Sequence, residues 1–226
     1  MNIYVEIPAR GGSKGVPRKA LRQLGGKPLI EYTIEHALTI ENVTKVFVNT
    51  DDAEIRDVSI ACGAEVPFLR PAELAGDNAD LGQAHQFALS KYEALQGFIP
   101  DIVVIMSPTN PFRRKNLVNY SLKKALDDDS IFNIGSVAPA SVDYGNYWLF
   151  DKDGVRKFIP ELNCSLMPDI LYQSSMSFNI VMNYRKNVLF ELLPFVLNPV
   201  EAIDIDTQQD FLLASLVVEK ELYPFE

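Results

Sequence analysis

Residues 3–19 read Ile-Tyr-Val-Glu-Ile-Pro-Ala-Arg-Gly-Gly-Ser-Lys-Gly-Val-Pro-Arg-Lys. The first five residues are mostly apolar and predict a β-strand, and the remainder predicts a glycine-rich loop. From residue 7 to residue 30 there is no acidic residue, although the chain as a whole has a formal net charge of -9. The same stretch holds six basic residues: Arg10, Lys14, Arg18, Lys19, Arg22 and Lys27. Because glycine lets backbone N–H groups approach phosphate oxygens and Lys and Arg neutralise them, this segment predicts a polyphosphate site.

Outward from this loop, apolar runs alternate with segments whose apolar residues recur every three or four positions. The expected strands are residues 3–7, 45–48, 66–69, 102–106 and 131–137, and the expected helices are 29–38, 53–62, 81–95 and 117–126. This alternation predicts an α/β fold with a mostly parallel sheet covered on both faces. Such sheets bind ligands beyond the carboxyl ends of their strands, which is where the basic loop leaves the first strand.

Polar pairs mark the starts of two helices. Asp51 followed by Glu54 indicates the start of the helix at 53–62. Thr207 followed by Asp210 indicates the start of a last helix that reaches about Glu221.

The pattern changes after about Pro139. Residues 146–150 and 155–158 predict a hairpin around Lys152-Asp153-Gly154, and residues 178–182 and 202–205 are expected as later strands. A short hairpin must pack on another surface, which could belong to a second copy of the chain or to its own domain. We therefore expect a single domain over residues 1–226 with a dimerisation or lid insertion at about 139–177.

Composition excludes several classes of protein. No apolar run reaches the roughly 18 residues of a membrane span, and no signal-peptide pattern opens the chain. Cys62 and Cys164 are too few for a disulfide framework or a zinc site. The acidic balance argues against nucleic acid as a partner. We expect a cytoplasmic protein with no membrane or nucleic-acid partner.

Two aspartates near the C-terminus indicate a metal site. If residues 202–205 form a strand, Asp204 and Asp206 lie on one face of the chain. Mg²⁺ commonly takes one or two carboxylates together with substrate phosphates. The alternative is an acidic strand end that caps the next helix.

Further candidates follow two other expected strands. Arg70 could clamp a phosphate or pair with Glu73. Residues 107–113, Ser-Pro-Thr-Asn-Pro-Phe-Arg, could line the same crevice or form a structural turn. The phosphate loop of the P-loop NTPases and the dinucleotide fingerprint are both absent, and His36 and His85 are expected on helix faces.

With these segments the chain resembles the acylneuraminate cytidylyltransferases, also called CMP-sialic acid synthetases. The markers are Ile-Pro-Ala-Arg-Gly-Gly-Ser-Lys-Gly-x-Pro-x-Lys at 7–19, Asn-Thr-Asp at 49–51, Leu-Arg-Pro-Ala-Glu-Leu-Ala-x-Asp at 69–77, Pro-Thr-x-Pro-x-Arg at 108–113 and Asp-Ile-Asp-Thr at 204–207. The resemblance implies a Rossmann-like three-layer sandwich of the nucleotidyltransferase type with a small hairpin dimerisation arm. It also implies a homodimer that uses Mg²⁺ to transfer CMP from CTP to the anomeric hydroxyl of a nine-carbon ulosonic sugar acid, releasing pyrophosphate.

Site residues follow from the resemblance by matching position. The catalytic residues would be Arg10, Lys14 and Asp206, and the metal ligands would be Asp204 and Asp206. The nucleotide would be bound by Ala9, Arg10, Gly11, Gly12, Ser13, Lys14, Lys19, Arg70, Asp77 and Ala79. The sugar acid would be bound by Ser107, Thr109, Gln173 and Asn179.

The chain departs from the family pattern at Ala20, Leu81 and Ser107. The family usually has Asn, a small polar residue and Gln at these positions, respectively. Because most of these changes lie on the expected sugar side, they favour a modified acid such as a diamino nonulosonate. The alternatives are transfer to an eight-carbon octulosonic acid and a non-catalytic nucleotide-binding homologue.

Overall fold

The structure is a computed structural model that describes residues 1–76, 79–114, 116–127, 133–139, 147–151, 154–158, 172–182 and 192–225. Its centre is a mixed sheet with the strand order β10-β6-β9-β5-β1-β4. The strands are β1 (Ile3–Pro8), β4 (Val43–Asn49), β5 (Ile102–Ile105), β6 (Asn133–Pro139), β9 (Tyr172–Met182) and β10 (Leu192–Val196). Strand β1 runs parallel to β4 and β5, whereas β9 is antiparallel to β5 and β6.

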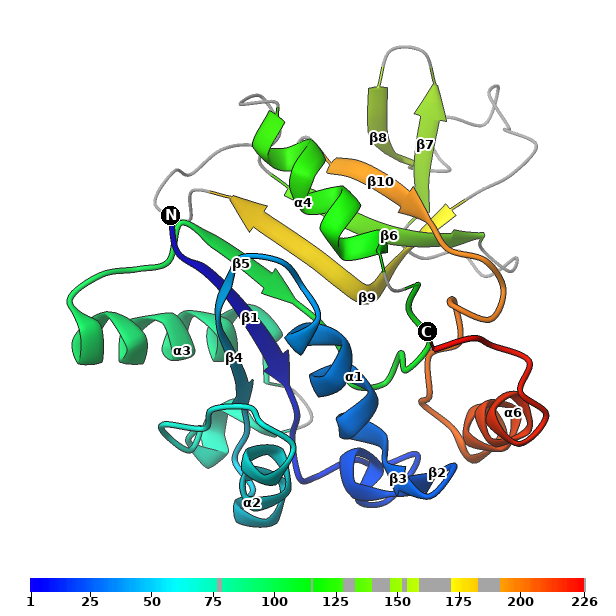
Figure 1. Cartoon of the computed structure of the whole chain (residues 1–226), viewed down its shortest axis with the longest axis horizontal. Helices are drawn as coiled ribbons and strands as arrows, with labels where there is room; N and C mark the ends of the chain where they lie inside the picture. Colours follow the sequence, from blue (N-terminus) through cyan, green and yellow to red (C-terminus); the bar gives the residue numbers. More distant parts are fainter. Residues whose placement is uncertain are drawn as a thin grey trace.

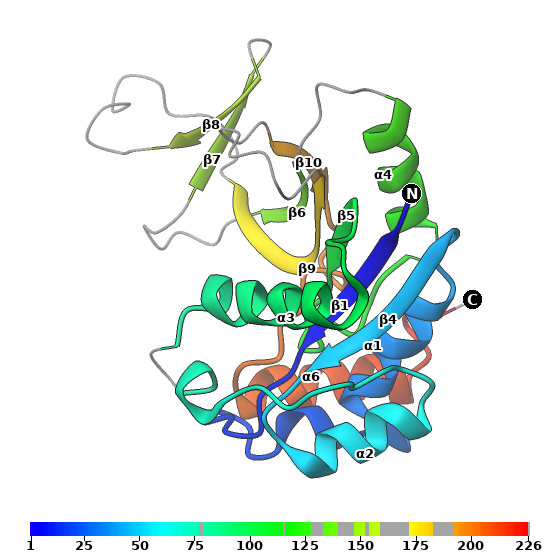
Figure 2. The same cartoon turned by 90° about the vertical axis from the view of Figure 1, so that its left-hand side faces the viewer.

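Helices cover both faces of the sheet (Figures 1 and 2). Helices α1 (Leu29–Leu38), α2 (Ala53–Ala61) and α4 (Leu117–Asp127) share one hydrophobic core with one face. Helix α3 (Leu81–Gln96) packs on the opposite face. The predicted three-layer α/β fold is therefore confirmed. Of the strands in this order, β9 runs antiparallel to its neighbours, and the others run parallel to one another.

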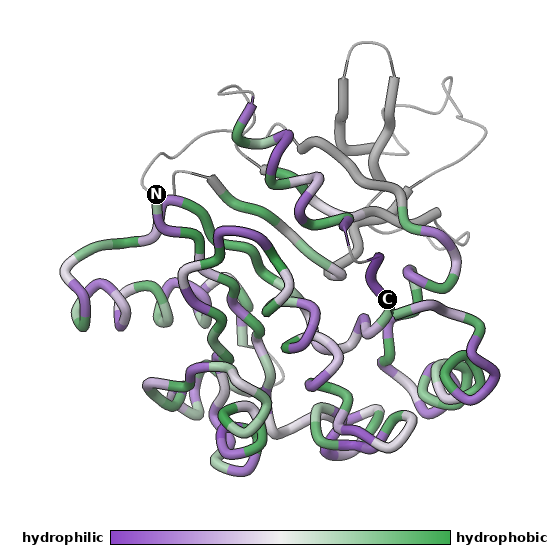
Figure 3. Tube along the Cα trace, viewed as in Figure 1, coloured by the Kyte–Doolittle hydropathy of each residue, from purple (hydrophilic) through white to green (hydrophobic). Residues whose placement is uncertain are grey.

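Strand β1 shows how the sequence divides the two layers. Ile3, Val5 and Ile7 are fully buried against the α1 side, as period-two alternation requires. Tyr4 points to the other face and packs edge-to-face on Tyr92 of α3, with ring centroids 5.3 Å apart. The hydrophobic character of the central strands is visible in Figure 3.

The C-terminal end of the chain packs beside α1. Helix α6 (Gln208–Glu219) contacts a small ribbon of β2 (Gln23–Leu24) and β3 (Lys27–Pro28). Two single-turn 3-10 helices, η1 (Lys19–Leu21) and η2 (Ala72–Leu74), complete the connections on this side. Thr207 caps α6 in a reciprocal pair with Asp210, as predicted.

Two expected strands are absent from the described residues. Residues 66–69 form no strand, and only Glu65 bridges to Phe47 of β4. Residues 202–205 are irregular because their main chain bonds to a loop instead of a sheet strand: Ile205 N donates to the Thr109 carbonyl at 2.9 Å.

The predicted cap of α2 is wrong by one residue. Asp52, not Asp51, accepts hydrogen bonds from the N–H groups of Glu54 and Ile55. Because Asp51 does not cap α2, its carboxylate can contact the basic loop.

The predicted hairpin is present as β7 (Tyr147–Asp151) and β8 (Gly154–Phe158), with its turn residues 152–153 outside the described residues. Strand β7 also pairs with β9 of the same chain. The structure thus gives the hairpin a surface on its own domain, while a role in dimerisation stays a prediction. Within the described part of the chain, no helix has the length and apolar character needed to cross a membrane.

Candidate functional site

A cavity of about 450 Å³ opens beyond the carboxyl ends of β1 and β5. It is lined by segments that lie far apart in the sequence: the loop after β1, Arg70, the start of α3, the loop after β5 and the segment before α6. The lining residues are Pro8, Ala9, Arg10, Ser13, Lys14, Gly15, Lys19, Ala20, Leu29, Arg70, Leu81, Ser107, Pro108, Thr109, Asp204 and Asp206. The basic loop and the two aspartates therefore meet in one pocket.

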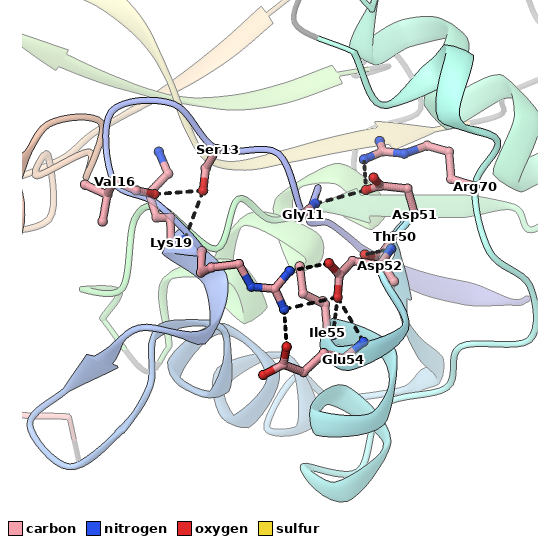
Figure 4. A network of polar contacts seen from close by, with 11 residues as sticks. Gly11, Ser13, Val16, Lys19, Thr50, Asp51, Asp52, Glu54, Ile55 and Arg70 are labelled. Carbon is pink, nitrogen blue, oxygen red and sulfur yellow. Dashed lines mark hydrogen bonds and ion pairs between the residues drawn. The ribbon is translucent and has the colours of Figure 1, made fainter.

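The glycine-rich loop is held in shape by its own hydroxyl and by an acidic neighbour (Figure 4). Ser13 Oγ donates to the Val16 carbonyl at 2.7 Å and accepts from Lys19 N at 3.0 Å. Gly11 N donates to Asp51 Oδ1 at 3.0 Å. The loop is preorganised by these bonds, so a ligand does not have to order it.

The six basic residues of this region divide into two groups. Arg10, Lys14 and Lys19, the expected nucleotide ligands of this region, line the cavity. Arg18 instead pairs with Asp52 and Glu54 at the start of α2. The remaining two basic residues also contact the scaffold: Arg22 bonds Gln208 and lies over the Phe211 ring, and Lys27 pairs with Glu35 and lies over the Tyr32 ring.

The two aspartates differ in their surroundings. Asp206 is well exposed and pairs with Lys19, with 2.8 Å between Oδ1 and Nζ. Asp204 lines the cavity and is exposed as a residue, but partial desolvation of its carboxyl raises its pKa. A hydrogen bond from Thr109 opposes the rise, and the negative charge of Asp206 adds to it.

These two carboxylates could supply part of a metal site. The described residues contain no group of three or more His, Cys, Asp and Glu side chains arranged to hold a metal by themselves. A pair of carboxylates facing a cationic pocket suits Mg²⁺, which keeps several waters and takes phosphate oxygens as further ligands. The donor set therefore fits Mg²⁺ bound together with a phosphate ligand.

Hydrogen bonds from neighbouring elements fix the segment that carries Asp204 and Asp206. Asp210 of α6 accepts hydrogen bonds from the N–H groups of Asp206 and Thr207, at 3.1 and 2.7 Å. The Asn110 side chain donates to the Ile203 carbonyl at 3.1 Å. Asp206 is thus held by the first turn of α6 although it lies in irregular backbone.

The loop after β5 depends on a buried arginine. Arg113 is 3% exposed and donates to the carbonyls of Ser177 and Ser107 and to the Thr33 hydroxyl. Desolvation lowers the pKa of Arg113 to about 9. The loop that brings Ser107 and Thr109 to the cavity is therefore tied to β9 and α1 at once.

Arg70 is buried in the cavity wall. Its guanidinium lies 3.8 Å from Asp51 Oδ1, so Asp51 rather than Glu73 is its acidic partner. Desolvation lowers the pKa of Arg70, and the charges of Asp51 and Glu6 oppose this shift.

The remaining predicted site residues are placed less directly. Gly11 and Gly12 lie in the basic loop, and Ala79 precedes α3, but none of the three lines the cavity. Asp77 lies outside the described residues, and for Gln173 and Asn179 only the backbone is described. Six lining residues were not among the predicted ligands: Pro8, Gly15, Ala20, Leu29, Leu81 and Pro108.

The fold and cavity define a nucleotidyltransferase architecture. The solved structure of a CMP:2-keto-3-deoxy-manno-octonic acid synthetase complexed with CTP matches with a TM-score of 0.73. It covers 98% of this chain and 100% of that chain at 17% identity. The 4-diphosphocytidyl-2C-methyl-D-erythritol synthase from Anaerococcus prevotii matches with a TM-score of 0.57 at 13% identity, covering 96% and 98% of the two chains.

Sequence comparison then gives the family. The sequence model of the cytidylyltransferases matches residues 5–131, and the chain belongs to this family. A CMP-N,N'-diacetyllegionaminic acid synthase of Legionella pneumophila is 31% identical over 97% of each chain. A pseudaminic acid cytidylyltransferase of Campylobacter jejuni is 38% identical over 56% of this chain and 54% of its own length. The N-acylneuraminate cytidylyltransferase of Escherichia coli O18:K1:H7 is 29% identical over 96% of this chain and 52% of its own length. The resemblance seen in the motifs is confirmed.

Proposed function

We propose that this protein transfers CMP from CTP to the anomeric hydroxyl of a nine-carbon ulosonic sugar acid and releases pyrophosphate. The observation that supports this most directly is that Lys14 and Asp206, 192 positions apart in the sequence, line the same cavity. A cationic loop suits the triphosphate, and the carboxylate pair suits the Mg²⁺ that accompanies it.

The charges of the pocket suit this reaction. The anomeric oxygen attacks the α-phosphorus, and negative charge accumulates on the departing pyrophosphate. Since catalysis of such transfers consists mainly of positioning and electrostatic stabilisation, Arg10 and Lys14 act by stabilising the leaving group. Lys19 and Arg70, which also line the cavity, hold the nucleotide.

Asp204 and Asp206 are the residues that would hold Mg²⁺. When bound, this ion neutralises phosphate oxygens and favours ionisation of the attacking hydroxyl. In its absence, Lys19 compensates the charge of Asp206.

The sugar acid is proposed to be a diamino nonulosonic acid of the legionaminic or pseudaminic type. The relative that aligns over 97% of both chains bears a legionaminic name. Leu81 and Ser107, which depart from the sialic acid pattern, both line the cavity and so could alter which acid fits.

Pyrophosphate release from CTP with a panel of sugar acids, with and without Mg²⁺, tests the proposal. The panel contains N-acetylneuraminic acid, diamino nonulosonic acids of both types and an eight-carbon octulosonic acid. We expect magnesium-dependent release with a diamino acid. Fastest release with the eight-carbon acid would favour octulosonate transfer, and CTP binding without release under any acid would favour a non-catalytic protein.

The hairpin of β7 and β8 is proposed to contribute to a homodimer. Light scattering of the native protein and of a variant lacking residues 147–158 tests this, since a dimer should become a monomer on deletion. An unchanged mass would contradict it.

A further inference from the structure

Three polar side chains are buried together behind the cavity wall, between the sheet and α3. Glu6 of β1, Asn49 of β4 and His85 of α3 are 1%, 0% and 5% exposed, respectively. Asn49 Nδ2 donates to Glu6 Oε1 at 2.7 Å, and the other carboxylate oxygen of Glu6 is hydrogen-bonded to His85 Nδ1. We refer to Glu6, Asn49 and His85 as the Glu6 cluster.

Stability alone does not explain a carboxylate at this position. The neighbouring residue on the same face of β1 is Tyr4, which packs in an aromatic core with Phe47 and Tyr92. Burial of a charge in such surroundings is costly unless it is paired, and an apolar residue of similar volume is often as stable or more so. The Glu6 cluster is therefore a candidate for a role in the adjoining site.

Each member of the cluster belongs to an element that leads into the cavity wall. Glu6 precedes Pro8, Ala9 and Arg10 in β1 and the basic loop. His85 lies one helical turn after Leu81, which lines the cavity. Asn49 also donates to the Ala84 carbonyl at 3.0 Å, so it joins β4 to α3.

The main chain of Arg70 is bonded next to the Glu6 cluster. The backbone N–H of Arg70 donates to the carbonyl of Thr50 at 2.7 Å, and Thr50 directly follows Asn49. The Arg70 guanidinium is directed to Asp51, which also accepts from Gly11 N (Figure 4). Asp51 compensates the buried charge of Arg70 only in part, because its Oδ1 atom lies 3.8 Å from the guanidinium and also accepts from Gly11 N. The Nε atom of Arg70 is buried and has no hydrogen-bond partner among the described residues, and the negative charge of Glu6 opposes the desolvation that lowers the pKa of Arg70.

We propose that the Glu6 cluster is a positioning device for Arg70. The buried carboxylate of Glu6, itself fixed by His85 and Asn49, holds the guanidinium in the cavity wall and so sets the affinity of the pocket for the triphosphate. The identity of that ligand rests on the proposed function, whereas the coupling between Glu6 and Arg70 does not.

A double-mutant cycle in the ligand-free protein tests the coupling. Glu6→Gln removes the charge but can still accept from Asn49 and donate to His85. It should lower the melting temperature of the native protein and should not lower that of Arg70→Met, in which no guanidinium needs a counter-charge. Glu201→Gln is the matched control, because Glu201 is an equally buried carboxylate whose partners lie elsewhere: it pairs with Arg114 and accepts hydrogen bonds from the Tyr223 hydroxyl and the Asn198 N–H. Glu201→Gln should change the melting temperature by the same amount in the native protein and in Arg70→Met.

Calorimetric titration with CTP provides the functional arm. Glu6→Gln should weaken binding about 5- to 10-fold, the scale of one lost electrostatic contact, and should have no further effect in Arg70→Met. Glu6→Asp, which keeps the charge, should restore most of the affinity, and His85→Leu should weaken binding while His85→Gln restores it.

Additive effects of Glu6→Gln and Arg70→Met, in melting temperature or in CTP affinity, would overturn the proposal. If the native protein bound no CTP, the proposed function would fail, and the melting-temperature cycle would still decide the role of Glu6.

Discussion

Gly15 lies directly against the main chain of Asp206. A Cβ atom at residue 15 would come within 1.9 Å of the Asp206 carbonyl oxygen and 3.1 Å of its carbonyl carbon. No L-amino-acid side chain fits this gap without moving backbone. The contact brings the cationic loop and the carboxylate pair to the two sides of one pocket.

Gly15→Ala should therefore separate the two loops and lower kcat/KM by at least about 100-fold, because catalytic groups displaced by about 1 Å lose that much. Gly12→Ala is the control for a changed glycine in the same loop, since an added Cβ there meets no atom within 4 Å. Steady-state kinetics should show a loss at least about tenfold smaller for Gly12→Ala. Equal losses would mean that loop flexibility, not the Asp206 contact, is what Gly15 supplies.

Arg10→Ala should lower kcat/KM by about 100-fold or more, the usual effect of removing one group that stabilises transition-state charge. Arg22 lies in the same basic stretch but does not line the cavity, since it donates to the Gln208 side chain and lies over the Phe211 ring. Arg22→Ala should stay within about twofold of the native rate, as expected for a surface change. Comparable losses in both variants would show that overall positive charge, rather than position, matters.

Asp206→Asn should also cost about 100-fold in kcat/KM, and part of the loss should be recovered at raised Mg²⁺ concentration. Asp57→Asn makes the same change in an exposed pair with Arg56 and serves as the control. Rates measured across a magnesium titration would contradict the metal assignment if Asp206→Asn had normal turnover and a normal magnesium requirement.

Local patterns in the sequence predicted most of the fold. Apolar runs predicted β1, β4 and β5, and three- and four-residue spacing predicted the helices within one or two residues. The strands expected at residues 66–69 and 202–205 were wrong because an apolar run does not reveal which partner its main chain will bond: β4 lies at the sheet edge, yet only Glu65 bridges to it, and Ile205 bonds to the Thr109 carbonyl in a loop. That information is long-range.

The site was predictable where its residue types are unusual on a loop, as for Arg10, Lys14 and Asp206. Leu29 was missed as a lining residue because an apolar side chain at a helix start resembles a core residue, and Leu81 was singled out only through the family resemblance. His85 was expected on a helix face, and its partner Glu6 is 79 positions away, beyond any local spacing rule.

Arg113→Lys should destabilise the fold by at least about 2 kcal/mol, because a lysine cannot replace three hydrogen bonds from one planar guanidinium. The bonds at risk join the loop after β5 to β9 and α1, including Nε to the Ser177 carbonyl at 2.8 Å and Nη1 to Thr33 Oγ1 at 3.0 Å. Urea unfolding measures the effect, with Arg56→Lys at the surface as a control that should not change the free energy of unfolding. A native-like midpoint for Arg113→Lys would contradict this role.

His36 should make stability depend on pH. Burial, together with the nearby charge of Arg113, lowers the pKa of His36 to about 3, well below the value of about 6.5 expected in the unfolded chain. Between these values the unfolded state binds the extra proton, so stability is fully present above pH 6.5 and is lost as the pH falls. At pH 5.5 the loss is about 1.4 kcal/mol, or roughly 3 to 5 °C in melting temperature for a chain of this size. His36→Gln, which does not titrate, should lose that much less between pH 7.5 and 5.5 when both proteins are melted in the same buffers. Parallel curves for the two proteins would show that His36 takes up its proton equally well in the folded and unfolded states.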